Sequence, residues 1–125
     1  MREIEFIGPE MAMEHASFQM FKHINYKIGV IVPRYAMLPR LKHEFDLNIK
    51  SIDSKGIHKC TESQTHLNNG SSIYFTVSKP DIFRGIQLNT IFSMYEPIQY
   101  ELKLQLIPLL AMGGPNTILY TVYDR

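Results

Sequence analysis

The stretch at residues 27–33, Lys-Ile-Gly-Val-Ile-Val-Pro, constrains the fold more than any other part of the sequence. It is a continuous apolar run rich in β-branched residues, without the polar alternation of a strand that has one wet face. Such a run is typical of a strand that is buried on both faces, as in a parallel sheet. A sheet of that kind needs helices on its faces, so the sequence indicates an α/β domain.

A helix is expected on each side of this strand in the sequence. The first follows a short apolar strand at residues 4–7 and extends to about Asn25, because apolar residues recur at spacings of three and four. Its inward residues are Met13, Ala16, Ser17, Met20, Phe21 and Ile24. The second is expected at residues 35–45, with Leu38, Leu41 and Phe45 facing inward. Its basic neighbours, expected on or near the outer side, are Arg34, Arg40, Lys42 and His43.

The rest of the chain is predicted to be mostly strands. Residues 46–60 alternate weakly, and the turn signal Asn68-Asn69-Gly70 predicts a β-hairpin over residues 59–77. Strands are expected at residues 90–94 and 117–123, with a helix between them that begins near Pro97 and that Pro108 must bend or end. This order predicts a mostly parallel sheet with helices on both faces and one inserted β-hairpin.

Composition predicts a single cytoplasmic domain. A chain of 125 residues with 45% hydrophobic and 20% charged residues is ordinary for a globular protein. The formal net charge of +1 gives no global electrostatic case for nucleic-acid binding. The single cysteine, Cys60, excludes an internal disulfide and fits a reducing compartment. No secretory signal and no run of about 18 apolar residues is present, so no membrane span is expected.

A metal site and a cysteine nucleophile are not expected. His58, Cys60 and His66 do not follow a standard zinc spacing, and no fourth ligand is specified. No motif supports Cys60 as a catalytic nucleophile. We therefore expect neither a metal nor a cofactor.

The stretch from Gly8 to His15 lies where a nucleotide-binding domain has its phosphate loop, after a strand and before a helix. That loop reads G-x-x-x-x-G-K-[ST]; its backbone N–H groups surround the phosphates and its lysine adds positive charge. Gly8 is in place, but Met13, Glu14 and His15 stand where Gly, Lys and Ser/Thr belong. A glutamate in place of the lysine turns attraction into repulsion. These four residues are therefore predicted to be degenerate phosphate-loop positions.

Several segments together resemble the ATPase domain of the large terminase subunit of tailed phages, the DNA-packaging motor. The densest part is the Asn-Asn-Gly-Ser-Ser-Ile run at residues 68–73, followed by Arg84-Gly85 and by the apolar strand from Thr90 to Glu96. Upstream, residues 28–33 are similar to the strand after the family's first helix. Downstream, residues 107–114 and 117–121 are similar to the segment before its coupling strand and to that strand. The match depends on the order and spacing of these pieces.

The resemblance implies a three-layer, P-loop NTPase-like (RecA-like) fold over residues 1–125, without the family's nuclease domain. The family's second motif supplies an Asp that holds the metal and a Glu that activates water. Here Met94, Tyr95 and Glu96 occupy those positions, so the Asp is missing. Arg84 is the one candidate for a retained contact to nucleotide or to a coupling element; the alternative is a surface arginine in a turn. ATP hydrolysis is therefore not expected.

Three functional hypotheses follow from these residues. The first is a phage-encoded, non-catalytic, terminase-like pseudo-ATPase domain in the host cytoplasm that binds a protein partner, such as a motor subunit, and modulates DNA packaging. The second is a small nucleic-acid-binding module on an α/β scaffold. Its candidate contacts are Arg34, Arg40, Lys42 and Lys22. The third is an enzyme that uses Glu14, His15 and Glu96 in a noncanonical way.

Overall fold

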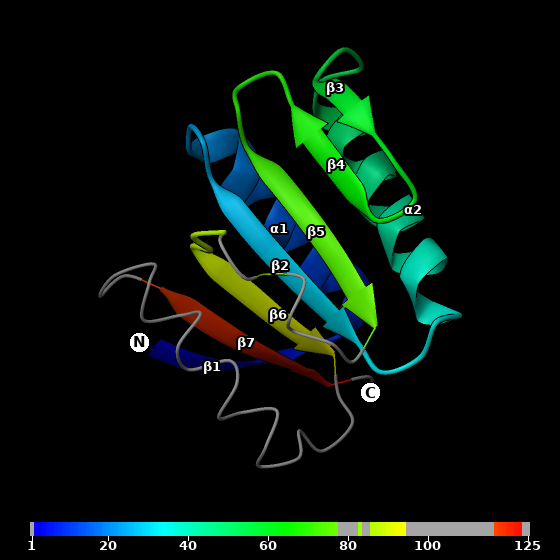
Figure 1. The fold of residues 1–125 in the computed structure, drawn as a ribbon, viewed down its shortest axis with the longest axis vertical. Helices are drawn as coiled ribbons and strands as arrows, with labels where there is room; N and C mark the ends of the chain where they lie inside the picture. The colour runs from blue at the N-terminus through cyan, green and yellow to red at the C-terminus, as the bar shows by residue number, and fades with distance from the viewer. Residues whose placement is uncertain (1, 78–82, 84–85, 95–116, 124–125) are drawn as a thin grey trace.

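The computed structural model describes residues 2–77, 83, 86–94 and 117–123, which form two helices and seven strands (Figure 1). The elements are β1 (Arg2–Ile7), α1 (Pro9–Lys22), β2 (Lys27–Val32), α2 (Met37–Ile52), β3 (Ile57–Cys60), β4 (Gln64–Leu67), β5 (Ser72–Val77), β6 (Thr90–Met94) and β7 (Ile118–Tyr123).

The seven strands form one sheet in the order β1-β7-β6-β2-β5-β4-β3. The first five strands in that order, from β1 to β5, run parallel to one another. β4 and β3 extend the sheet beyond β5, and each is antiparallel to the strand before it in the order. The predicted fold class, a mostly parallel α/β sheet, is confirmed. β2 lies in the centre, and all of its residues except Lys27 are buried, as its continuous apolar sequence predicts.

Helices α1 and α2 lie side by side on the same face of the sheet (Figure 1). The main core lies between them and that face, and includes Met13, Val30, Phe45 and Phe75. A smaller apolar cluster lies on the opposite face and is formed by Ile31, Phe83, Leu88, Ile91 and Leu119. The helix expected from Pro97, which would cover this second face, lies outside the described residues.

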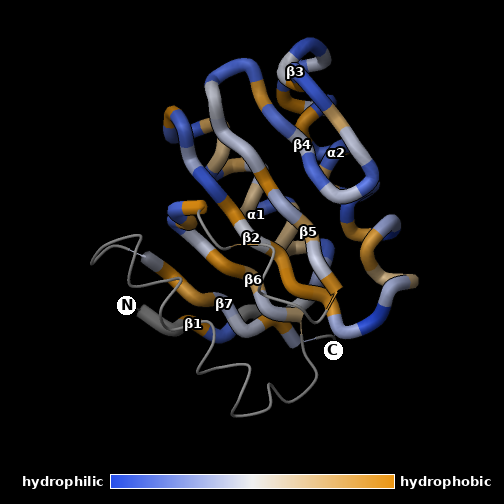
Figure 2. Tube along the Cα trace, viewed as in Figure 1, coloured by the Kyte–Doolittle hydropathy of each residue, from blue (hydrophilic) through white to orange (hydrophobic). Residues whose placement is uncertain are grey.

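Gly29 allows the second cluster to approach the central strand closely. A Cβ atom on Gly29 would stand 3.0 Å from both Phe83 and Leu88, tighter than ordinary van der Waals contact. Figure 2, coloured by hydropathy, shows that apolar residues are concentrated on the central strands β2 and β6. The sheet is therefore packed on both faces around β2.

The predicted hairpin is part of a three-stranded meander, β3-β4-β5. The Asn68-Asn69-Gly70 turn joins β4 to β5 as predicted, and Gly70 has the positive φ of 85° that this turn requires. The amide of Asn69 also donates to the carbonyl oxygen of Met20 at 2.7 Å, near the end of α1. The turn therefore fixes the meander to the first helix.

Both helix boundaries differ from the sequence predictions. α1 ends at Lys22, and Ile24, expected to face inward, is 79% exposed. α2 continues to Ile52 rather than ending near Phe45, so the strand-like reading of residues 46–52 is wrong. The physical reason is that Ile49 extends the inward spacing of Leu41 and Phe45 by one more turn and is fully buried.

Candidate functional site

One residue, Gly8, separates β1 from α1. Gly8 has φ 88°, and its N–H donates to the carbonyl oxygen of Tyr123 at 2.8 Å. The helix begins at Pro9, whose fixed φ suits the first helical position, and Ala12 N–H already donates to Gly8 at 3.0 Å. Residues 9–15 therefore form the first turns of α1, and no loop lies between Gly8 and the helix.

The first turn of α1 carries an acidic side chain that is paired with α2. The carboxylate of Glu10 accepts a hydrogen bond from Arg40 Nη2 at 2.6 Å. This bond from Arg40 is the main cause that lowers the pKa of Glu10. A helix amino terminus attracts anions, and Pro9 offers no N–H there. A carboxylate of the chain itself therefore lies in the first turn, at the end of the helix where an anionic ligand would be favoured.

The other three residues predicted to be degenerate phosphate-loop positions point in different directions. Met13 is fully buried in the main core, whereas Glu14 is exposed. His15 is half-buried, with Nε2 3.1 Å from the Tyr120 hydroxyl and its ring packed edge-on against Phe92 and Tyr120. Burial lowers the pKa of His15, so its neutral form is favoured. Helical geometry therefore keeps the three side chains from converging on one ligand.

The second-motif positions are only partly described. Met94 ends β6 and is 3% exposed, within the main core. Tyr95, Glu96 and Arg84 lie outside the described residues, so their roles stay predictions. The third hypothesis, which needs Glu96 beside Glu14 and His15, has no further geometry to support it.

A polar network that the sequence analysis missed joins α2 to the meander. Lys42, expected to face outward, is buried and donates to Asp46 Oδ2 at 2.7 Å and to Cys60 Sγ at 2.9 Å. Thr65 donates to the other oxygen of Asp46 at 2.6 Å. Desolvation alone would lower the pKa of Lys42, but the bonds to Asp46 and Cys60 outweigh it and the pKa is raised. The available signal was the i,i+4 spacing of Lys42 and Asp46 on one helix.

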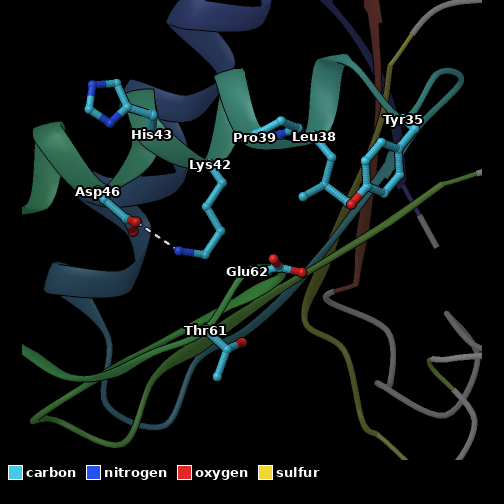
Figure 3. A pocket seen from close by; sticks show the side chains of 8 residues that line it. All are labelled: Tyr35, Leu38, Pro39, Lys42, His43, Asp46, Thr61 and Glu62. Atoms are coloured by element: carbon cyan, nitrogen blue, oxygen red, sulfur yellow. Dashed lines mark hydrogen bonds and ion pairs between the residues drawn. The ribbon is translucent and has the colours of Figure 1, made fainter.

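A cavity of about 240 Å³ lies beside this network, between α2 and the β3–β4 loop (Figure 3). Its walls are formed by Tyr35, Leu38, Pro39, Lys42, His43, Asp46, Thr61 and Glu62. Lys42 and Asp46 are joined across one side of it, and the Glu62 side chain points toward α2 (Figure 3). The possible use of this hollow is considered below.

The basic residues proposed for nucleic-acid contact do not form one patch. Lys42 is buried and paired, and Arg40 is paired with Glu10. Lys22 is in the last turn of α1, near the amino ends of the parallel strands. Arg34 follows the carboxyl end of β2, at the other edge. These four residues therefore lie at different places around the two helices.

The three residues considered for a metal site have other surroundings. His66 contacts the Ser72 hydroxyl at 2.7 Å and Gln64 at 3.0 Å, while Cys60 faces Lys42. Within the described part of the chain, no group of three or more His, Cys, Asp or Glu side chains is placed to hold a metal ion. Among the same residues, neither helix is long and apolar enough to cross a membrane.

No family model and no curated protein matches the sequence. Solved structures do match. The ATPase domain of the large terminase of Thermus phage P74-26 superposes with a TM-score of 0.77 at 14% identity, and an arginine mutant of that domain with 0.75 at 13%. Each match covers 98% of this chain and 59% of the other. The chain therefore has the fold of phage large terminase ATPase domains, over about three-fifths of their length, and the predicted P-loop NTPase-like fold is confirmed.

Proposed function

We propose that this chain is a non-catalytic, terminase-like pseudo-ATPase domain that acts through a protein partner and modulates phage DNA packaging. The observation that carries the proposal is the β1–α1 junction. Its backbone is helical from Pro9, and Glu10, paired with Arg40 at 2.6 Å, occupies the first helical turn. A nucleotide phosphate would meet a carboxylate there instead of free N–H groups and a lysine.

Binding to a protein partner is the role that we propose for a domain that has the terminase ATPase fold but does not bind nucleotide. A subunit of the packaging motor is the partner that we favour, because the fold is that of a terminase ATPase domain. The chain would then assist or inhibit assembly of the motor.

Isothermal titration of the full chain with ATP and Mg²⁺ tests the proposal directly. We expect no binding at micromolar nucleotide and no release of phosphate. Micromolar affinity or measurable turnover would falsify the proposal. A protein of the same fold with an intact phosphate loop serves as the positive control for the same buffer and metal.

Restoring the motif's residues tests whether chemistry or backbone excludes the nucleotide. We expect the variant Met13→Gly, Glu14→Lys and His15→Thr to bind no ATP, because the helix leaves no loop to surround a phosphate. Removing the buried Met13 side chain should also cost about 3–5 kcal/mol, from the cavity and from glycine in a helix. Denaturant unfolding measures that loss.

The single variant Glu14→Lys is the matched control for the triple variant, because Glu14 is exposed. It should leave the free energy of unfolding nearly unchanged. Recovery of ATP binding in the folded triple variant would mean that charge and side-chain size, rather than helical backbone, exclude the nucleotide.

A nucleic-acid-binding role is the second candidate, and one observation favours it. On the sheet face away from the helices, Lys59 stands opposite His66, and Lys27 Nζ lies 3.4 Å from the Ser72 hydroxyl that His66 also contacts. Burial is the largest cause that lowers the pKa of His66, and the electrostatic influence of Lys27, Lys59 and His58 lowers it further. These basic residues differ from the candidate contacts proposed from the sequence, which are Arg34, Arg40, Lys42 and Lys22.

A mobility-shift assay with DNA at several salt concentrations tests this second candidate. Binding should weaken steeply as salt rises and should fall in the variant Lys27→Ala and Lys59→Ala, but not in Lys50→Ala, an exposed lysine on α2. If the chain shifts no DNA at low salt, the second candidate is removed.

A further inference from the structure

The cavity between α2 and the β3–β4 loop is separate from the β1–α1 junction. Its volume of about 240 Å³ is below that of pockets for drug-sized ligands, which suits one side chain better than a whole small-molecule cofactor. We propose that it receives the guanidinium group of an arginine side chain from a partner protein. The inference rests on the proposed function, because it gives the partner's contact a place and a chemistry.

Charge is the first reason for this choice. Lys42 and Asp46 neutralise each other across one wall, with Nζ and Oδ2 2.7 Å apart and side chains 7% and 15% exposed. Glu62 adds a carboxylate that points into the gap toward α2 (Figure 3). Among the described residues, no cation forms a salt bridge with Glu62. The cavity therefore has an excess of negative charge, which complements a cation and disfavours a phosphate or carboxylate.

The shape of the side chains is the second reason. Tyr35 is 71% exposed at one end of the cavity, with its hydroxyl directed toward the space that Glu62 borders (Figure 3). An exposed aromatic ring is a platform on which a guanidinium can stack. Leu38 and Pro39 supply an apolar wall along which the methylene stem of an arginine can lie. A carboxylate and a ring together suit the planar fork of arginine better than the point charge of lysine.

The test is a titration of the full chain with the peptide acetyl-Gly-Arg-Gly-amide, followed by ¹H–¹⁵N NMR. We expect saturable shifts at residues 35, 38 and 62. The same peptide with citrulline, which has the shape of arginine without the charge, should bind several-fold more weakly. A response of equal size to the two peptides, or shifts that do not saturate, would overturn the proposal.

Two variants locate the contact. Glu62→Gln should weaken binding of the arginine peptide by about fivefold, as expected for the loss of one exposed charge pair. Tyr35→Ala, as a separate variant, should weaken binding by more. The control variant Glu44→Gln changes a residue on α2 that does not line the cavity, so it should bind the peptide as tightly as the unchanged chain. Equal binding by Glu62→Gln would place the peptide elsewhere.

The outcome is separable from that of the proposed function. The cavity lies against the β3–β4 loop and does not include Gly8, Glu10 or Glu14. ATP binding would refute the pseudo-ATPase proposal without changing the peptide result. Failure of the peptide to bind would refute the arginine site while leaving the nucleotide result as it is.

Discussion

Helix α2 carries two ion pairs whose geometries are nearly the same and whose environments are opposite. Arg40 and Glu10 are 2.6 Å apart, with side chains 61% and 49% exposed, and join the two helices. Lys42 and Asp46 are 2.7 Å apart, with side chains 7% and 15% exposed, and face the meander. An exposed pair contributes about 0–1 kcal/mol, whereas breaking a buried pair costs about 3–5 kcal/mol. Distance alone therefore says little about what each pair does.

The difference in exposure between the two pairs indicates which pair contributes to stability. Asp46 holds three groups from three elements, since Lys42 on α2, Cys60 on β3 and Thr65 on β4 all lie within hydrogen-bonding reach of its carboxylate. Glu10 lies in the first turn of α1 and is paired with Arg40 on the neighbouring helix. We regard the buried Lys42–Asp46 pair as part of the attachment of the meander to α2, and the exposed Arg40–Glu10 pair as a surface contact between the two helices.

The largest effect is expected from Asp46→Ala. It leaves the Lys42 ammonium buried without its carboxylate and removes the acceptor of Thr65, so the free energy of unfolding should fall by about 3–5 kcal/mol. Urea unfolding followed by far-UV circular dichroism measures it. The paired change Lys42→Met and Asp46→Leu is the matched control, because it removes both charges and should cost much less. If the two variants lose equal stability, packing rather than the unpaired charge is the cause.

A smaller effect is expected from Thr65→Val. This change keeps the shape of the fully buried side chain but removes the 2.6 Å hydrogen bond to Asp46, which should cost about 1–2 kcal/mol. The same urea unfolding measures the loss. In the background of Lys42→Met and Asp46→Leu, Thr65→Val should cost less, because the carboxylate is already gone; a full loss there would contradict the network.

The smallest effect is expected from Glu10→Gln, at about 0–1 kcal/mol near neutral pH. The lowered pKa of Glu10 means that its contribution is present above the unfolded carboxyl's value of about 4.3 and is lost as the pH falls through the lower folded-state pKa. Unfolding measured at pH 7 and at successively lower pH, with and without 1 M salt, should show a difference between the chains that is largest at pH 7 and low salt and shrinks as the pH falls. A large, salt-independent loss would make this pair as structural as the buried one.

The sequence predicted the sheet because its signals are local. The β-branched run at residues 27–33 requires burial on both faces, and the Asn-Asn-Gly turn requires positive φ at Gly70, whatever the rest of the chain does. The resemblance to phage terminases likewise depended on the order of such segments, and the superposition agrees with it.

The sites were harder because they depend on long-range contacts. The i,i+4 spacing of Lys42 and Asp46 indicates a pair, but nothing near Lys42 in the sequence shows that β3 and β4 cover it, so its burial is not predicted. The phosphate-loop motif sets residue types but not backbone, and Pro9 starts the helix earlier than the motif would. The partnership of Glu10 with Arg40 joins two helices and has no local sequence signal.

The pairing of β1 with β7 has a consequence for how this protein is made. β7 lies between β1 and β6, with Arg2 opposite Ile118 and Ile7 opposite Tyr123. Gly8, the residue just before α1, also donates its N–H to the Tyr123 carbonyl oxygen. During synthesis β1 therefore waits without its neighbour until nearly all of the described chain has left the ribosome, and a sheet dominated by such distant pairings folds slowly. We expect a late ordering of this edge, with β2, β5 and the meander forming first.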